Sequence, residues 1–308
     1  MGTLGTVFND VFRDAFEKGA LGKIETTITE HNVYQEGSDV LLPYLDRIVE
    51  GLVLPGSGVD GMENLEELLD KAREGKSCLL LVEHYSNLDL SLFSWLVRQA
   101  GGRGREIDRA LVSIAGMKLN EENPMVATMA SAYTRLVIYP SRSVESLDPE
   151  KDREEILRSN AINRAAMKAL LEIKKQTKIV LVFPSGTRYR PWDPSTKKGV
   201  REIDSYIRSF DYMCFVALNG EVLHVHQGGM LEDPVSQDLV RISAGKIRSC
   251  TEFREQIRAS AEAAGIEDKK QAVVDAIMAE LEEMHGAAEA RRQKLLTTPP
   301  LREPGVSG

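Results

Sequence analysis

The sequence lacks any apolar run long enough to cross a lipid bilayer. Unbroken apolar stretches such as Leu79–Val82 and Ile179–Phe183 fall far short of the roughly 20 residues that a membrane-spanning helix needs. The N-terminus also lacks the basic-then-apolar pattern of a secretory signal. We therefore expect a cytoplasmic protein, with peripheral contact at the inner face of a membrane as an open alternative.

Cysteine is scarce as well. The 308 residues include three, Cys78, Cys214 and Cys250, and no Cys-x-x-Cys pair. The first two lie inside apolar runs, where a thiol packs like a small hydrophobic side chain. We expect all three to be reduced and structural.

Basic residues are outnumbered by acidic ones, 39 to 47, which gives a formal net charge of −8. This balance argues against nucleic-acid binding, because such proteins neutralise phosphates with clustered lysines and arginines. Residues 164–201 are the exception: ten basic and two acidic side chains give this segment a charge of +8 and leave −16 for the remainder. A solvated helix face explains the lysines of the 160s and 170s (Lys168, Lys174, Lys175 and Lys178) equally well as binding of an anionic partner does.

From residue 64 onward, helical periodicity alternates with short continuous apolar runs. Strands that are apolar throughout are typical of a sheet that helices cover on both faces. We therefore predict an α/β fold with a largely parallel mixed sheet covered by helices on both faces, and with helical N- and C-terminal additions. A long helix is predicted over 148–175, with Asp148 as its N-cap. The predicted strands are 77–83, 110–115, 135–139, 179–183, 213–218, 222–225 and 239–243.

The chain divides into four parts by pattern. A helical N-terminal region, 1–60, precedes the α/β domain at 61–245. Amphipathic C-terminal helices, 246–295, are expected to pack on that domain. The Pro- and Gly-rich tail, 296–308, is expected to be disordered.

An apolar stripe at helical spacing opens the chain, formed by Val7, Phe8, Val11, Phe12 and Phe16. Such a helix packs on the body of its own protein or lies on a membrane surface. We favour packing, because an interfacial helix normally carries more Lys and Arg on its polar face.

His84 ends a predicted buried strand, and Asp89 follows five residues later. A helix that begins between them, capped by Ser86 or Asn87, folds the carboxylate back towards the imidazole. The carboxylate then fixes the tautomer of His84 and leaves its other nitrogen free to accept a proton from a substrate hydroxyl. The alternative is a histidine that only satisfies a helix cap.

The segment Phe183–Pro191 also follows a predicted strand. Gly186 permits a sharp backbone turn. Arg188 and Arg190, two residues apart, point to the same side when the backbone is extended, and Pro191 favours that form. Two adjacent guanidinium groups suit a phosphate dianion, although arginines that bridge to surface carboxylates are an alternative.

Together the two segments resemble the glycerolipid acyltransferases, whose members pair a His-x4-Asp block with a Phe-Pro-Glu-Gly-Thr-Arg block. The similarity extends to the soluble branch, the plastid-type glycerol-3-phosphate acyltransferase. That branch carries the pattern Pro-Ser-Gly-x-Arg-x-Arg-Pro, which Pro184–Pro191 reproduces at every fixed position, and an Ala-Gly-x-basic segment like Ala115–Lys118. The resemblance covers roughly residues 77–230.

The resemblance implies a role for individual residues. His84 is the general base and Asp89 is its partner. The residues implied in binding the substrate phosphate are Arg188, Arg190, Gly186, Ser185, Lys118 and Arg142. Two positions depart from the pattern: Ser185 replaces the glutamate of the wider family, as in the soluble branch, and Arg142 stands alone where that branch has a basic pair.

The predicted function is transfer of a fatty acyl group from acyl-CoA or acyl carrier protein to the sn-1 hydroxyl of glycerol 3-phosphate, in phospholipid biosynthesis. The chemistry requires no cofactor and no metal, and amides at the helix start after His84 are expected to stabilise the oxyanion. Lys197, Lys198 and Arg201 are expected to attract the negatively charged donor. A lysophosphatidate acyltransferase that makes phosphatidate is the alternative, and a non-catalytic membrane-binding adaptor is a remoter one.

Two hydrolytic reactions remain open as alternatives to acyl transfer. His224 and His226 alternate along a predicted strand and can be combined with His84 around a zinc ion. A serine hydrolase would use Ser86 or Ser185, but neither serine lies in a Gly-x-Ser-x-Gly elbow.

Overall fold

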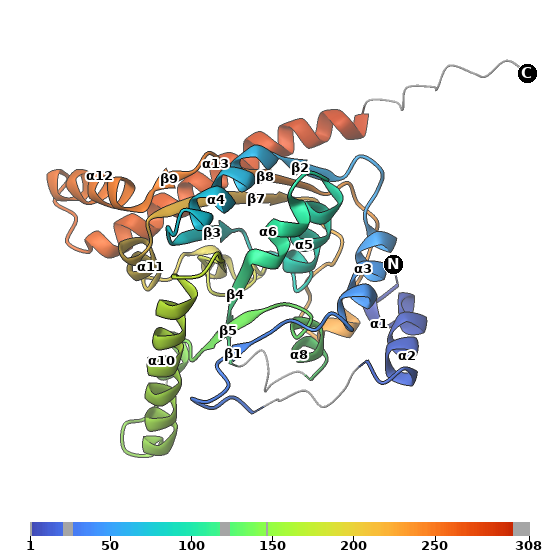
Figure 1. Ribbon diagram of the computed structural model, residues 1–308, viewed down its shortest axis with the longest axis horizontal. Coiled ribbons are helices and arrows are strands. Elements are labelled where there is room, and N and C mark those ends of the chain that lie inside the picture. The colour runs from blue at the N-terminus through green and yellow to red at the C-terminus, as the bar shows by residue number, and fades with distance from the viewer. Residues whose placement is uncertain (1, 21–26, 118–123, 146, 298–308) are drawn as a thin grey trace, which may run out of the picture.

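The computed structural model describes residues 2–20, 27–117, 124–145 and 147–297. Within these ranges the chain forms an α/β fold with one nine-stranded mixed sheet, mostly parallel, and helices on both faces (Figure 1). The predicted fold class is therefore confirmed. No helix in these ranges is long and apolar enough to cross a membrane.

The central strand of the sheet is β3, which has β6 on one side and β7 on the other, both parallel to it. The full order is β1-β5-β4-β6-β3-β7-β8-β2, and β9 pairs with β7. Three pairs are antiparallel: β1 with β5, β7 with β8, and β7 with β9. The strands are β1 (Tyr34–Gln35), β2 (Gly58–Asp60), β3 (Cys78–Val82), β4 (Leu111–Gly116), β5 (Arg135–Ile138), β6 (Ile179–Val182), β7 (Tyr212–Asn219), β8 (Arg241–Ala244) and β9 (Arg248–Ser249).

Alternate residues of β3 enter two different hydrophobic cores. Leu80 and Val82 pack with α1–α6 and α8, whereas Leu79 and Leu81 pack with α10–α13. Both faces of the sheet are thus buried, which explains why its strands are apolar throughout. The helices are α1 (Leu4–Val7), α2 (Asn9–Glu17), α3 (Leu42–Leu52), α4 (Met62–Arg73), α5 (Asp89–Gln99), α6 (Gly104–Ala110), α8 (Pro124–Ala130), α9 (Ser141–Glu145), α10 (Arg153–Ile173), α11 (Ile203–Ser209), α12 (Cys250–Ala263) and α13 (Lys269–Thr297), with short 3-10 helices at Pro194–Lys197 and Met230–Glu232.

Two helices differ from their predicted form. The long helix, α10, begins at Arg153 rather than at Asp148, because Asp148 Oδ1 accepts hydrogen bonds from the amides of Glu150 and Lys151 and so closes a turn that precedes the helix. The N-terminal stripe forms two helices, α1 and α2, on either side of Phe8. Phe8 and Val11 are buried in the core, so this part of the stripe packs on the body of the protein, whereas Val7 and Phe16 are 49 and 73% exposed.

Residues 222–225 do not form the predicted strand. Only Leu223 pairs there, in an isolated bridge to Val235. The amide of His224 donates to the carbonyl of Pro234, but Pro234 has no N–H to return a bond, and the ladder ends after one residue.

The first 60 residues, expected to be helical, also contribute β1 and β2 to the sheet. At the other end, residues 296 and 297 end α13, and the rest of the expected disordered tail, 298–308, lies outside the described residues.

The three cysteines are free and buried, as the sequence predicted. Burial raises the pKa of the thiols of Cys78, Cys214 and Cys250 to about 12. Thiols that stay protonated and buried have a packing role rather than a chemical one.

Candidate active site

The two sequence segments meet where neighbouring strands end. Leu81 of β3 lies opposite Val182 of β6 in the parallel register, so His84 and Phe183 leave the sheet side by side. The imidazole of His84 stacks on the phenyl ring of Phe183, with centroids 4.0 Å apart and planes inclined by 16°. The chain continues from β3 to helices on one face and from β6 to α11 on the other. This divergence is the position where open α/β sheets bind ligands.

His84 and Asp89 form a direct pair. The Nδ1 atom of His84 lies 2.9 Å from Asp89 Oδ2, and the carboxylate belongs to the first residue of α5, with 1% of its side chain exposed. No partner for His84 Nε2 is present among the described residues. A ring whose Nδ1 proton points to a carboxylate has Nε2 available as a base.

The loop between His84 and Asp89 holds the Asp89 carboxylate in place. The amides of Tyr85 and Ser86 donate to its Oδ2 at 2.5 and 2.9 Å, and the Ser86 hydroxyl donates to its Oδ1 at 2.7 Å. The expectation that amides at this helix start stabilise an oxyanion is therefore wrong for these two, because Asp89 already uses them.

The second segment turns at Gly186. Its φ angle is +64°, in the left-handed region, and a Cβ atom here would lie 3.1 Å from Val200 Cγ1. The Ser185 hydroxyl is buried and donates to the carbonyl of Thr187 at 2.7 Å. Gly186 and Ser185 therefore shape the turn that presents the arginines.

Tyr189, which lies between Arg188 and Arg190, is bonded to the backbone of His84. The amide of Tyr189 donates to the carbonyl of His84 at 2.9 Å. Burial lowers the pKa of the Arg188 guanidinium; Asp233 opposes this, and the positive charge of the neighbouring Arg190 adds to the lowering. Two half-buried cations this close repel each other, and a dianion bound between them would relieve that repulsion.

Of the other two cations expected at the phosphate, Arg142 is not brought to these arginines. Arg142 is exposed on α9, after β5, and β4 separates β5 from β6. Lys118 lies outside the described residues.

Asp233 is a site residue that the sequence did not suggest. Its Oδ2 lies 3.7 Å from Arg188 Nη1, and its Oδ1 lies 2.7 Å from His226 Nδ1. The side chain is almost fully buried. Asp233 lies 45 residues after Arg188 and in a loop, so no sequence spacing relates it to the arginines.

The described residues form neither the zinc site nor the serine hydrolase site that the sequence left open. His226 pairs with Asp233, and His224 Nε2 pairs with the Ser236 hydroxyl, while no group of three metal-ligating side chains converges anywhere in the described part of the chain. The hydroxyls of Ser86 and Ser185 bond to Asp89 and to a backbone carbonyl, respectively, and not to His84.

The basic residues proposed to attract the donor are largely used within the protein. Lys197 pairs with Glu282, and Arg201 Nε lies 2.8 Å from Asp268 Oδ2. Only Lys198 is exposed without a partner among the described residues. The charge available for donor attraction is smaller than the sequence indicated.

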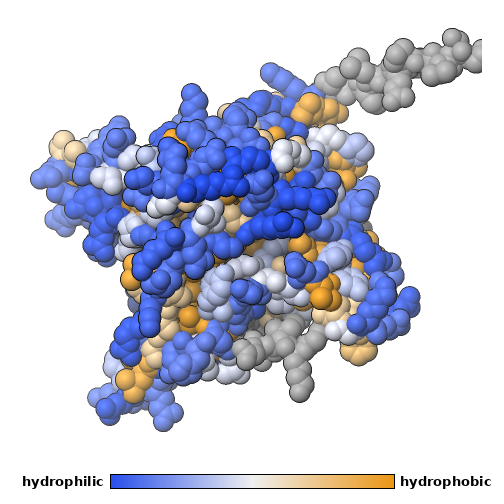
Figure 2. All heavy atoms as spheres, viewed as in Figure 1, coloured by the Kyte–Doolittle hydropathy of each residue, from blue (hydrophilic) through white to orange (hydrophobic). Residues whose placement is uncertain are grey.

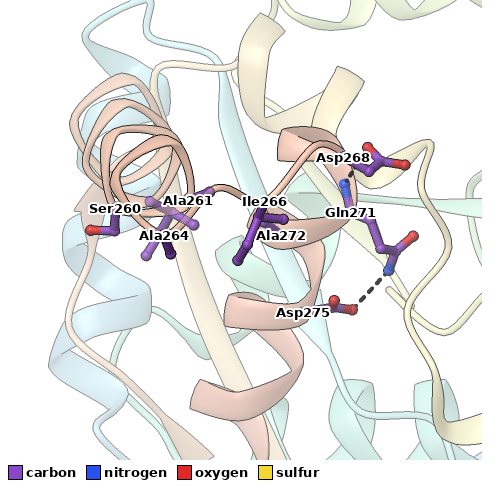
Figure 3. A pocket seen from close by; sticks show the side chains of 9 residues that line it. Ser260, Ala261, Ala264, Ile266, Asp268, Gln271, Ala272 and Asp275 are labelled. Atoms are coloured by element: carbon purple, nitrogen blue, oxygen red, sulfur yellow. Dashed lines mark hydrogen bonds between the residues drawn. The ribbon is translucent and has the colours of Figure 1, made fainter.

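A hollow of about 480 Å³ lies between α12 and α13, lined by residues that include Ile257, Ala261, Ile266 and Gln271 (Figure 3). None of its lining residues belongs to the segments that hold His84 or the arginines. Its location at the turn between two C-terminal helices makes it a feature of their packing, separate from the site at the strand ends.

A family model described as Acyltransferase matches residues 58–232, which is more than half of the chain and includes both segments of the site. No curated protein matches the sequence.

Proposed function

This chain belongs to the acyltransferase family, and we propose that it transfers a fatty acyl group from a thioester donor to the sn-1 hydroxyl of glycerol 3-phosphate. The observation that carries this proposal is the stacking of His84 on Phe183, with the Tyr189 amide bonded to the His84 carbonyl. These contacts support a site in which a base oriented by a carboxylate acts beside the segment that carries the two arginines. An alcohol that also carries a phosphate is the substrate that needs both.

The proposed reaction is a direct transfer. Nε2 of His84 accepts the proton of the glycerol hydroxyl while the oxygen attacks the thioester carbonyl carbon. The tetrahedral intermediate then expels the thiolate, which takes the proton from Nε2, so a new ester and a free thiol leave the site. Asp89 holds the ring in the required tautomer and stabilises the imidazolium that forms between the two steps.

The acceptor is proposed from the arginine segment. Arg188 and Arg190 would bind the phosphate, as in the soluble plastid-type branch, with Ser185 and Gly186 setting the turn. Lys118 remains a proposed contributor to phosphate binding, and Arg142, which lies on α9 after β5, is left out of the proposal. The donor is proposed to be acyl-CoA or acyl carrier protein, each of which presents a thioester on a negatively charged carrier.

One assay tests the acceptor and the reaction together. Labelled acyl donor is offered in parallel to glycerol 3-phosphate and to lysophosphatidate, with wild-type protein and with His84→Ala. Transfer to glycerol 3-phosphate that depends on His84 is the expected result. Transfer to lysophosphatidate alone would mean that lysophosphatidate, and not glycerol 3-phosphate, is the acceptor. Absence of transfer to either would favour the non-catalytic adaptor.

Peripheral membrane contact is proposed through α10. Leu157, Met167 and Leu171 of α10 are 60, 57 and 53% exposed, and Figure 2 shows hydrophobic surface along this projecting helix. Arg164 and Lys168 lie in the same outer stripe at helical spacing, and neither makes an ion pair in the described ranges. Exposed aliphatic side chains between cations match an anionic lipid surface, where the acylated product must be delivered.

A further inference from the structure

The C-terminal helix α13 contacts Glu83, the residue before His84, although α13 lies outside the family match at 58–232. Glu83 precedes His84 and points to the opposite face of the sheet, because side chains alternate along a strand. Its Oε2 lies 2.9 Å from His285 Nδ1 and accepts a hydrogen bond from the amide of Leu218 at 2.9 Å. The Glu83 residue is 7% exposed, so this is a buried, fully used carboxylate.

The same carboxylate anchors Tyr85, the residue after His84. The Tyr85 hydroxyl donates to Glu83 Oε1 at 2.9 Å and lies 3.3 Å from His285 Nδ1. Burial, together with the negative charge of Glu83, raises the pKa of Tyr85 far above its ordinary value, so the hydroxyl stays a donor. The ring of Tyr85 in turn packs edge-on against Tyr189, with centroids 6.2 Å apart.

Tyr189 is held from a second direction by the preceding turn of α13. Lys197 Nζ lies 5.7 Å from the centroid of the Tyr189 ring, and Lys197 pairs with Glu282, three residues before His285. Tyr189 separates Arg188 from Arg190. Two residues one helical turn apart on α13 therefore fix the tyrosine between the two arginines.

The loop between β6 and α11, which carries Arg188 and Arg190, also packs on α13 at Gly199. Gly199 packs so closely that a Cβ atom would lie 2.4 Å from Val274 Cγ1, and its carbonyl accepts a bond from Gln271 Nε2 at 3.4 Å. This close approach leaves the loop that carries the arginines no room to shift towards the helix.

We propose that His285 and Glu282 are positioning residues that hold Arg188 and Arg190 in place for the acceptor phosphate, through Tyr85 and Tyr189. The inference rests on the proposed function, in which these arginines bind a phosphorylated alcohol. Neither α13 residue touches the substrate. Their main effect is on the affinity for the phosphate, because their contacts lead to Tyr189 between the two arginines.

The test compares four variants in steady-state kinetics with acceptor and donor varied separately. His285→Leu removes the bond to Glu83 and is expected to raise the acceptor KM by about ten- to a hundredfold, the cost of a misplaced binding group, with kcat and donor KM little changed. His285→Asn keeps a donor near the position of Nδ1 and is expected to restore most of the acceptor affinity. Glu282→Gln, at an exposed side chain that folding tolerates, is expected to raise the acceptor KM by a smaller factor in the same direction. Glu283→Gln, exposed and next in sequence, is the matched control and should match the wild type.

Failure of this proposal is distinct from failure of the proposed function. An unchanged acceptor KM in folded His285→Leu and Glu282→Gln, or equal losses in kcat for every variant, would overturn the positioning role while leaving acyl transfer intact. If the wild type transfers no acyl group, binding of glycerol 3-phosphate measured by titration calorimetry replaces the kinetics. Weaker binding by the two variants then supports the positioning role, and absence of binding by the wild type overturns both proposals.

Discussion

The imidazole of His84 lies flat against the phenyl ring of Phe183, 4.0 Å away. These residues are 99 positions apart in sequence and follow two strands, β3 and β6, that are neighbours only because the chain inserts β6 between β3 and β4. The stack limits the rotation of the ring from one side, while Asp89 holds Nδ1. Together they leave Nε2 as the ring nitrogen that would accept the proton in the proposed reaction.

Replacing His84 by Ala should lower kcat by about 10²–10⁴-fold, the usual contribution of a general base. Asp89→Asn should also lower kcat, because an amide no longer selects the tautomer with a free Nε2. Steady-state rates with circular dichroism as a folding check measure this. His31→Ala, at an exposed histidine that pairs with Glu30, is the control. A His84 variant of normal rate would contradict the proposed mechanism.

Arg188→Lys and Arg190→Lys should each raise the acceptor KM by about ten- to a hundredfold, since hydrogen bonds to charged groups contribute about 1.5–3 kcal/mol and lysine cannot make the paired contacts of a guanidinium. The donor KM should stay constant. Arg208→Lys, at an exposed arginine of α11, controls for the substitution itself. Equal KM values for wild type and both variants would mean that the phosphate binds elsewhere.

Gly186→Ala should destabilise the protein by more than the backbone cost alone. A left-handed φ costs a non-glycine residue about 1–2 kcal/mol, and at Gly186 the new methyl also meets Val200. Gly75→Ala is a matched control, with φ +81° and no atom within 4 Å of the added Cβ. Urea unfolding of both variants separates the two contributions; equal losses would show that Val200 moves aside.

The ion pair of His285 with Glu83 should make stability depend on pH. Burial lowers the pKa of His285, but the bond to Glu83 and the charges of Glu83 and Glu282 outweigh this and the opposing charge of Lys197, so the folded-state pKa is raised. A histidine whose pKa is higher in the folded state than in the unfolded state stabilises the fold. This stabilisation is fully present below the unfolded-state pKa, about 6.5, and it is lost as the pH rises through the folded-state pKa.

The measurement is urea unfolding of wild type and His285→Asn at about pH 5.5, below the unfolded histidine value, and at about pH 8.5, well above it. The wild type should exceed the variant in unfolding free energy by more at the lower pH. Tyr85 faces the same imidazole but stays neutral throughout this range, and His31→Asn is the exposed control. A difference that is constant with pH would contradict the raised pKa.

Met167→Asp with Leu171→Asp should reduce binding of the protein to vesicles that contain phosphatidylglycerol. Lys168→Gln should weaken that binding about fivefold, since each basic residue near an anionic surface contributes about 1 kcal/mol. Sedimentation with pure phosphatidylcholine vesicles and with added salt tests the charge dependence. Val40→Asp, at an exposed apolar residue elsewhere, is the control. Undiminished binding by the α10 variants would remove this helix as the membrane contact.

The order of strands and helices in the α/β domain was legible in the sequence, because strands buried on both faces are apolar throughout and contrast with amphipathic helices. Two of the errors came where one local group decides the structure. Pro234 prevents the strand at 222–225, and the turn capped by Asp148 delays α10 to Arg153. Neither effect alters hydrophobic periodicity, so pattern analysis cannot detect it.

The sequence by itself determined the chemical groups of the site: a base with its carboxylate within five residues, and two arginines beyond a glycine turn, each set local in the chain. Only the tertiary structure decided what joins and holds them. Phe183 under His84, Asp233 beside Arg188, and His285 with Glu83 are contacts between segments far apart in sequence. Such contacts follow from strand order and helix packing, and these are properties of the whole folded chain rather than of any local pattern.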